Sequence, residues 1–369
     1  MSYLDPITRR QWLTRAAVAS AAVAGGAMGL TPGCAAAPES PAPAQSPAEA
    51  LAKAGAPQKS RVVVIRHEAF GTSRDALAAG KVRAEDPPWR ELLDEAAKTL
   101  GGDAKPADAW ARWFKPADRI SIKVNCLGYV TSPAMATSLA AALSACGVAP
   151  EQIILWDRTC HELQAAGYEL RNSGAGPRCF GTDALAALRG NAGYAADVTT
   201  SGAIGSMYSR IVTDESTALI SAPILKDHNI AGLSCGLKNF FGAIHNPNKY
   251  HENGCDPFVA DVVAHPLIRD RLRLVVCGAM RPQYNGGPTV RPQWQWPYGG
   301  LLMATDPVAL DRVALEIIAR KRAAAGMPPL DAEKRPVRYL ESAQARGLGT
   351  ADLASIEVVS LGKPWMDVG

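Results

Sequence analysis

The chain has 369 residues, of which 47% are hydrophobic and 20% are charged, and its formal net charge at pH 7 is +4. This composition is that of an ordinary globular protein with a sizeable hydrophobic core. The small net charge gives no reason to expect a nucleic acid or an acidic lipid surface as a partner.

The N-terminal segment has the pattern of an export signal. Arg9 and Arg10 precede a run of small and apolar residues from Ala16 to Leu30, which is the order of a twin-arginine signal. The run has about 15 residues, whereas a membrane-spanning helix needs about 20 predominantly apolar ones. We therefore expect residues 1–34 to be a signal peptide read by the twin-arginine translocase, a periplasmic mature protein, and no transmembrane helix in the mature chain.

Two features follow this signal. Cys34 comes after Leu30 and Gly33 in a loose match to a lipoprotein signal, so a lipid attached at Cys34 is the alternative to a free mature protein. Residues 35–60 are rich in Ala, Pro and Ser and show no apolar periodicity. Such a composition predicts a flexible linker.

The rest of the chain alternates between strand and helix patterns. Runs of β-branched and aliphatic residues predict buried strands at Arg61–Arg66, Arg119–Val124, Gln152–Trp156, Ala218–Ile224, Arg273–Cys277 and Ile356–Ser360. Helical spacing predicts helices at Trp89–Leu100, Pro133–Cys146, Glu162–Asn172 and Pro307–Lys321. This alternation indicates an α/β fold in which helices cover parallel-rich sheets. The length suits two lobes, which we place at residues 61–205 and 206–369.

Chemistry in such folds collects at the carboxyl ends of the strands. The polar residues at the ends of the predicted strands are Lys123, Asn125, Asp157, Arg158, His161, Lys226, Asp227 and His228. Asp306 stands apart from this set, because it precedes Pro307 at the start of a predicted helix. A helix-capping role explains Asp306 without a ligand.

The eight cysteines are scattered singly, with no C-x-x-C spacing. This pattern gives no support to a zinc ribbon, and no iron-sulfur cluster is expected. One disulfide stays open as an alternative, and the pattern does not name its partners.

Residues 226–251 form the densest group of functional side chains. They hold three of the six histidines, at 228, 245 and 251, and three lysines, interrupted by glycines. Glycines allow close backbone approach to a ligand, and clustered histidines can hold a divalent metal or transfer protons. We therefore predict a functional site in this segment. The alternative is a solvated loop whose histidines have no role.

The chain resembles a known family over residues 118 to 315. Four blocks carry the resemblance to the domain-of-unknown-function 362 (DUF362) family: DRISIKVN at 118–125, PILKDH at 223–228, GLKNFFG at 236–242 and TDPVALD at 305–311. The family name implies no activity.

A weaker similarity is to the nickel-dependent lactate racemase. His228 and Lys238 are ten residues apart across a glycine-rich turn, as are a histidine and the cofactor-bearing lysine of that enzyme. The resemblance implies a lactate-racemase-like fold, with His161 and His228 as the acid/base pair and Lys238 as the covalent anchor of a nickel-pincer nucleotide. It further implies His251 or His245 as the metal ligand.

The chain departs from the racemase pattern at the substrate-binding positions. Asn125 stands where the racemase has a strand-end aspartate, and Thr131-Ser132-Pro133 stands where it has Thr-Arg-Pro, so the carboxylate-binding arginine is missing. We expect Lys123 or Lys226 to supply that charge, and lactate itself is not predicted.

These observations lead to two hypotheses. The first is a racemase- or epimerase-like isomerase, dependent on a divalent metal or a nickel-pincer cofactor, that transfers a proton or hydride on a small anionic organic molecule. The second is a non-catalytic periplasmic protein that binds a metal or an anion through the same side chains.

Overall fold

A computed structural model describes residues 59–66, 88–185 and 192–369, and all of them belong to one compact unit. The predicted signal peptide at 1–34, including Cys34, and nearly all of the predicted linker lie outside the described residues. Within the described part of the chain, no helix is long and apolar enough to cross a membrane.

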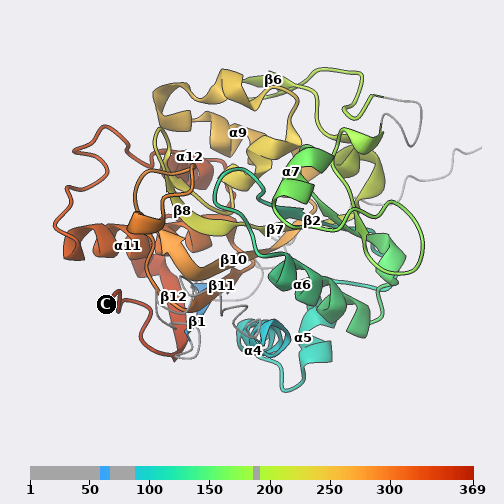
Figure 1. Cartoon of the computed structure of the whole chain (residues 1–369), viewed down its shortest axis with the longest axis horizontal. Coiled ribbons are helices and arrows are strands. Elements are labelled where there is room, and N and C mark those ends of the chain that lie inside the picture. Colours follow the sequence, from blue (N-terminus) through green and yellow to red (C-terminus); the bar gives the residue numbers. More distant parts are fainter. Residues whose placement is uncertain (1–58, 67–87, 186–191) are drawn as a thin grey trace, which may run out of the picture. The chain divides into compact units, whose positions relative to one another are not determined.

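A ten-stranded, mostly parallel sheet forms the centre of the fold (Figure 1). Its main order is β12-β1-β11-β10-β7-β2-β3-β4, and β8 pairs with both β10 and β9. The strands are β1 (Ser60–Arg66), β2 (Ile120–Val124), β3 (Ile153–Trp156), β4 (Arg178–Cys179), β7 (Ala218–Ala222), β8 (Ile224–His228), β9 (Gly232–Ser234), β10 (Leu272–Gln283), β11 (Gly300–Ala304) and β12 (Ile356–Gly362). All six predicted strands are present, and the predicted α/β class is confirmed.

The direction of the strands creates the edge at which the site lies. β2 is parallel to β3 and to β7, and β10 is parallel to β7 and then to β8. Only β11 and β9 run antiparallel to their neighbours in this sheet. The carboxyl ends of β2, β3 and β8 therefore meet on one side of the molecule.

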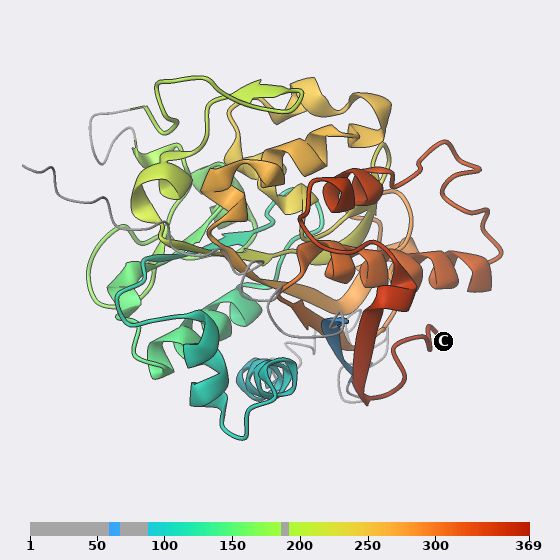
Figure 2. The same cartoon turned by 180° about the vertical axis from the view of Figure 1, so that it is seen from behind.

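Alternating side chains along each strand divide the core between the two faces of the sheet. On β1, Val62 and Val64 belong to one apolar cluster, and Val63 and Ile65 to the other. Because both faces are covered, the strands read as nearly continuous apolar runs. Helices α4 (Trp89–Gly101), α5 (Pro106–Trp113) and α6 (Pro133–Ala145) cover one face, and α9 (Phe258–Ala264), α11 (Pro307–Ala324) and α12 (Tyr339–Ala345) cover the other (Figures 1 and 2).

Shorter elements complete the described chain. They are helices α7 (Cys160–Ala165) and α10 (Pro266–Arg269), the two-stranded sheet of β5 (Thr199–Ser201) and β6 (Ile204–Ser206), a π-helical turn at Ile211–Glu215, and 3-10 turns at Pro150–Gln152, Lys238–Ala243, Pro247–Tyr250, Glu252–Cys255, Pro292–Trp294 and Leu353–Ser355.

Three of the four predicted helices form as α4, α6 and α11. Asp306 caps α11 as predicted, because its Oδ1 accepts hydrogen bonds from the backbone N–H groups of Val308 and Ala309. The helix predicted at Glu162–Asn172 is wrong in its extent, since α7 ends at Ala165. Gly167 follows with a φ of 89°, and a glycine in this left-handed conformation ends a helix.

The predicted boundary at residues 205/206 falls inside one continuous sheet. β7, from the second predicted lobe, lies between β10 and β2 and is hydrogen-bonded to both. The strands that carry the predicted site residues therefore share one sheet edge.

The seven described cysteines are all free. Cys277 is fully buried among apolar side chains, as expected for a small hydrophobic residue. Its Sγ lies 3.5 Å from the Sγ of Cys235, which is also fully buried.

The central position of β2 predicts a large cost for truncating its side chains. Ile122 is fully buried, so Ile122→Ala should lower the free energy of unfolding by about 2–5 kcal/mol. Urea unfolding followed by circular dichroism measures this change. Val198→Ala is the matched control, since Val198 is 63% exposed. Equal unfolding midpoints for the two variants would contradict the assignment of β2 to the core.

Candidate functional site

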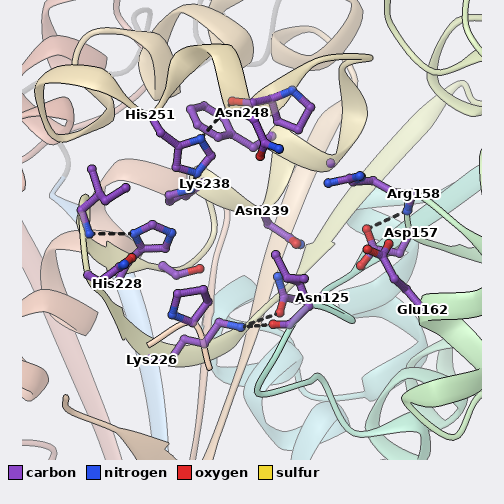
Figure 3. Close-up of a pocket in the computed structure, with 18 of the residues that line it drawn as sticks. Asn125, Asp157, Arg158, Glu162, Lys226, His228, Lys238, Asn239, Asn248 and His251 are labelled. Carbon is purple, nitrogen blue, oxygen red and sulfur yellow. Dashed lines mark hydrogen bonds between the residues drawn. The ribbon is translucent and has the colours of Figure 1, made fainter. Parts of the chain in front are cut away.

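A pocket of about 390 Å³ lies at the carboxyl edge of β2, β3 and β8 (Figure 3). The turns Lys238–Ala243 and Pro247–Tyr250 contribute to its lining. The polar lining residues are Lys123, Asn125, Asp157, Arg158, Glu162, Lys226, His228, Asn229, Ser234, Lys238, Asn239, Asn248, His251 and Thr289.

Six of the eight predicted site residues line this pocket, namely Lys123, Asn125, Lys226, His228, Lys238 and His251. His161 is exposed and is not part of the lining, although its neighbour Glu162 is. Successive residues of a helix point about 100° apart, which separates these two side chains. His245 is also exposed outside the pocket, where its ring meets that of Tyr194 edge to face at 5.0 Å.

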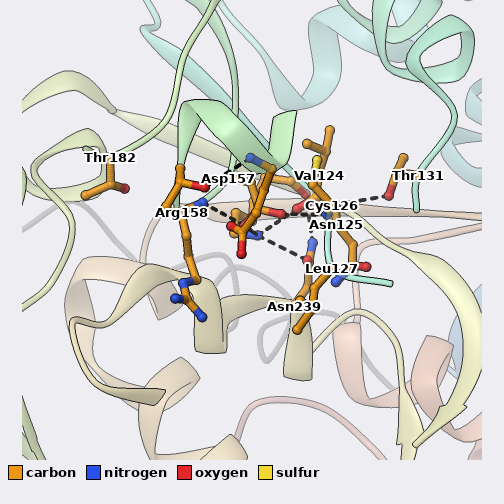
Figure 4. Close-up of polar contacts among 12 residues, drawn as sticks. Val124, Asn125, Cys126, Leu127, Thr131, Asp157, Arg158, Thr182 and Asn239 are labelled. Carbon is orange, nitrogen blue, oxygen red and sulfur yellow. Dashed lines mark hydrogen bonds and ion pairs between the residues drawn. The ribbon is translucent and has the colours of Figure 1, made fainter. Parts of the chain in front are cut away.

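Lys123 and Asp157 form a buried ion pair between the ends of β2 and β3, with Nζ 2.7 Å from Oδ1. The Lys123 ammonium also donates to the carbonyl oxygen of Val124 at 2.6 Å and to Oδ1 of Asn239 at 3.4 Å. Asp157 Oδ2 accepts the backbone N–H of Cys126, and Oδ1 accepts that of Arg158 (Figure 4). With every polar atom paired, this buried pair holds the strand ends together.

Gly242 lies beside this ion pair. A Cβ atom on Gly242 would lie 2.7 Å from Cε of Lys123 and 3.0 Å from Oδ1 of Asp157. A side chain at position 242 would therefore have to displace the end of the Lys123 side chain from its ion pair.

Lys226 joins β8 to the loop after β2 at the side of the pocket. Its ammonium donates to Asn125 Oδ1 at 2.8 Å and to the carbonyl oxygens of Leu127 and Tyr129 at 2.6 and 2.7 Å. Burial lowers the pKa of Lys226 to about 7. Because an ammonium has three protons and all three have acceptors, Lys226 ties β8 to the loop after β2.

Lys238 is buried with a single hydrogen-bond partner among the described residues. Its Nζ lies 3.2 Å from Nε2 of His251 and 4.3 Å from the centre of the Phe241 ring. Burial lowers the pKa of Lys238 to about 8. The pKa of this amine therefore lies close to neutral pH.

The protonation of His251 follows from its contacts. Its Nδ1 is 3.0 Å from the carbonyl oxygen of Pro247, which can only accept, so we assign the ring proton to Nδ1. Nε2 then presents its lone pair to Lys238. Burial, followed by the charge of Lys238, lowers the pKa of His251, which keeps the ring neutral.

His228 has the opposite tautomer. Its Nδ1 accepts the backbone N–H groups of Ile230 at 3.1 Å and Ala231 at 3.2 Å, so Nε2 carries the proton. Burial, with a smaller contribution from Lys238, lowers the pKa of His228 to about 2. The ring stacks on that of His251 with centres 5.6 Å apart. His228 is therefore a neutral hydrogen-bond donor at the pocket.

A buried carboxylate on α11 positions Lys238. Asp311 Oδ1 accepts the backbone N–H of Gly236 at 2.7 Å, and Oδ2 accepts that of Leu237 at 3.1 Å. Burial raises the pKa of Asp311 to about 7. Asp311 was not among the site residues predicted from the sequence. Its position as a carboxylate among apolar residues of a predicted helix could have indicated it.

Asp227 points away from the pocket. Consecutive strand residues face opposite sides of a sheet, so Lys226 and His228 face the pocket while Asp227 pairs with Arg335 at 2.7 Å. Its other oxygen accepts the backbone N–H of Gly287. Asp227 thus connects the segments around Gly287 and Arg335 to β8.

A comparison with protein families found a match over the part of the chain that forms the pocket. Residues 120–316, more than half of the chain, match the family described as Domain of unknown function (DUF362). The chain belongs to this family. A comparison with curated proteins found no match. The DUF362 resemblance is confirmed, whereas the similarity to the lactate racemase stays a prediction.

Eight polar residues of the pocket had no role assigned from the sequence, namely Asp157, Arg158, Glu162, Asn229, Ser234, Asn239, Asn248 and Thr289. Asp157 and Arg158 had a signal, because they follow a predicted strand. Asn229, Ser234, Asn239 and Asn248 had one too, because they lie in the predicted segment 226–251. Glu162 begins a predicted helix, but that pattern does not show which of its side chains face the pocket, and no local pattern indicated Thr289.

The described ranges contain no group of three or more His, Cys, Asp or Glu side chains that could hold a metal ion. The two predicted metal ligands lie apart, with His251 in the pocket of this DUF362 protein and His245 outside it. Among the described residues, the amine of Lys238 and the imidazole of His251 are the groups that could hold a cofactor.

The low pKa of Lys238 can be measured through its reactivity. Because its amine is the free base above about pH 8, the rate of acylation at Lys238 should be half-maximal near that pH. Peptide mass mapping after brief treatment with a small acylating reagent gives this rate. The same lysine in urea-unfolded protein is the control, and its midpoint should move to about 10.4. A folded-state midpoint as high as the unfolded one would contradict the proposed environment.

Proposed function

We propose that this DUF362 protein is an enzyme that binds a small organic anion in the pocket and transfers a proton on it, with Lys238 as the base and His228 as a hydrogen-bond donor. The observation that carries the proposal is the contact between the buried Lys238 ammonium and the lone pair of a neutral His251.

The charges of the lining favour an anion. Its cationic residues are Lys123, Arg158, Lys226 and Lys238, while its carboxylates are Asp157 and Glu162. The histidines of the pocket are neutral, so the lining has a net positive charge as long as Lys226 or Lys238 is protonated, and none once both are free bases. A partly buried positive cleft attracts anionic molecules and concentrates them at the site.

The pKa of Lys238 suits proton abstraction. A base is most effective when its pKa lies near the working pH, and burial brings the amine of Lys238 to about 8. After taking a proton from a carbon next to a carbonyl or carboxylate group, the new ammonium would donate to Nε2 of His251 and lie against the ring of Phe241. Return of that proton to the same face of the same carbon would restore the substrate and be seen as solvent exchange, whereas delivery of a proton to a different carbon or to the opposite face would complete an isomerisation.

His228 would stabilise the charge that develops on the substrate oxygen. Its Nε2–H is fixed by the two backbone donors that occupy Nδ1, and a neutral imidazole can donate to an oxyanion without giving up its proton. The resemblance implied His161 and His228 as an acid/base pair. The exposed position of His161 outside the pocket leads us to propose Lys238 as the base in its place.

The same residues fit a tethered cofactor that brings metal ligands of its own. Lys238 would offer its amine for covalent attachment, and His251 would offer Nε2, 3.2 Å away, as a single protein ligand. When bound, a nickel-pincer nucleotide supplies a hydride acceptor. We propose this as the second form of the function, in which His228 keeps its donor role.

Intact mass and metal analysis of protein purified from its native host separates the two forms. The tethered form predicts extra covalent mass and bound nickel, with both lost in Lys238→Met. Lys249→Met is the matched control, because Lys249 is exposed on a neighbouring turn. An unmodified chain without nickel leaves Lys238 as a free base.

Solvent exchange tests the reaction itself. In D₂O, the protein should exchange a carbon-bound proton next to the carboxylate or carbonyl group of at least one acid in a panel of small 2-hydroxy, 2-oxo and 2-amino acids, as followed by proton NMR. Exchange should rise with pH to a plateau above about pH 8 and fall about 100-fold or more in Lys238→Met. His228→Gln should slow exchange while leaving affinity largely unchanged. Binding without exchange for every acid in the panel would instead support a non-catalytic anion-binding protein.

We also propose that the protein is exported through the twin-arginine route, from the sequence pattern alone. Replacing both arginines, Arg9→Lys with Arg10→Lys, should retain the protein in the cytoplasm on cell fractionation. Cys34→Ala separates a lipid anchor from a free protein, since only a lipidated form would move from the membrane fraction to the soluble one. Periplasmic delivery of the double-lysine variant would argue against this route.

A further inference from the structure

Arg158 lines the pocket from the segment that follows β3, across from His228 and Lys238 (Figure 3). Its side chain is partly exposed, and within the described residues its guanidinium makes no hydrogen bond and no ion pair. The neighbouring Asp157 does not neutralise it, because both Asp157 oxygens are occupied by Lys123 and by backbone N–H groups.

The other cations of the pocket differ from Arg158 in this respect. Lys123 donates to Asp157, Val124 and Asn239. The Lys226 ammonium likewise has three acceptors. Lys238 has one partner, the imidazole of His251. Arg158 and Lys238 are therefore the two cations that keep donors free for a ligand.

We infer that Arg158 determines specificity by binding a second acidic group of the substrate, so that the substrate class is a small dianion with a carboxylate at the Lys238 end and a carboxylate or phosphate at the Arg158 end. This inference rests on the proposed function, whose site it completes. A guanidinium presents a planar fork of donors that binds a carboxylate or phosphate through two parallel hydrogen bonds.

Glu162 limits how this end of the pocket can be used. Its carboxylate lines the pocket, four residues after Arg158, and makes no ion pair with it. Like charges repel, so the negative group of a ligand must lie on the Arg158 side. Removing the Glu162 charge should therefore strengthen the binding of a dianion, and removing Arg158 should weaken it.

Calorimetry with matched probes tests the inference. Succinate and butyrate have the same number of carbons but carry two and one carboxylates, and phosphoglycolate tests a phosphate in the second position. Wild-type protein should prefer succinate or phosphoglycolate to butyrate. Arg158→Gln should lose about 10- to 100-fold of its affinity for the preferred dianion with little change for butyrate. Arg158→Lys should recover part of that loss, and Glu162→Gln should bind the dianion more tightly than wild type.

Arg338→Gln is the matched control, since Arg338 is exposed and lies outside the pocket. Protection of Arg158 from phenylglyoxal by the preferred dianion, mapped by mass spectrometry, tests the same contact in wild-type protein without relying on a variant that must fold. Equal losses for mono- and dianion in Arg158→Gln, or no dianion preference in wild type, would overturn the inference. Dianion preference without solvent exchange would leave Arg158 in place and refute the proposed reaction instead.

Discussion

Three lysines are buried at one edge of the sheet, and the need to compensate their charge organises the pocket. Lys123 is neutralised by Asp157, and Lys226 is surrounded by three oxygen acceptors. Lys238 has neither kind of partner, since its one hydrogen-bond partner among the described residues is a neutral imidazole. Burial lowers the pKa of both Lys226 and Lys238, but the three acceptors of Lys226 use all of its donors. Lys238 is therefore the buried lysine whose amine keeps hydrogen-bonding capacity for a ligand.

The four family blocks meet around these lysines. The block at 118–125 contributes Lys123, and the block at 223–228 contributes Lys226. The block at 236–242 carries Lys238, and the block at 305–311 supplies the Asp311 carboxylate that holds the backbone in front of it. The blocks at 236–242 and 305–311 are thus joined by hydrogen bonds although they are far apart in the chain. Asp311 belongs to the site as a positioning residue and not as a ligand-binding one.

The pocket could be predicted in outline because parallel strands place their carboxyl ends together. That rule indicated Lys123, Lys226 and His228, and each lines the pocket. It also indicated His161, which lies outside the lining, because α7 begins at Cys160 and a step of one residue along a helix turns the side chain by about 100°. His245 lies outside the pocket for a related reason. Clustering along the chain does not determine which side chains of a loop turn inward.

The sequence by itself determined six of the strands, three of the helices, the family and the group of cations, because these depend on local hydrophobic patterns and on short motifs. Only the tertiary structure decided which of these cations keep hydrogen-bond donors without a protein acceptor. The acceptors that saturate Lys226 come from residues about 100 positions earlier, and Asn239 reaches Lys123 across 116 positions. Hydrogen-bond partners so distant in the chain leave no local signal. All three donors of Lys226 have acceptors, whereas Arg158 and Lys238 keep donors for a ligand. This difference therefore arises only when the sheet edge is assembled.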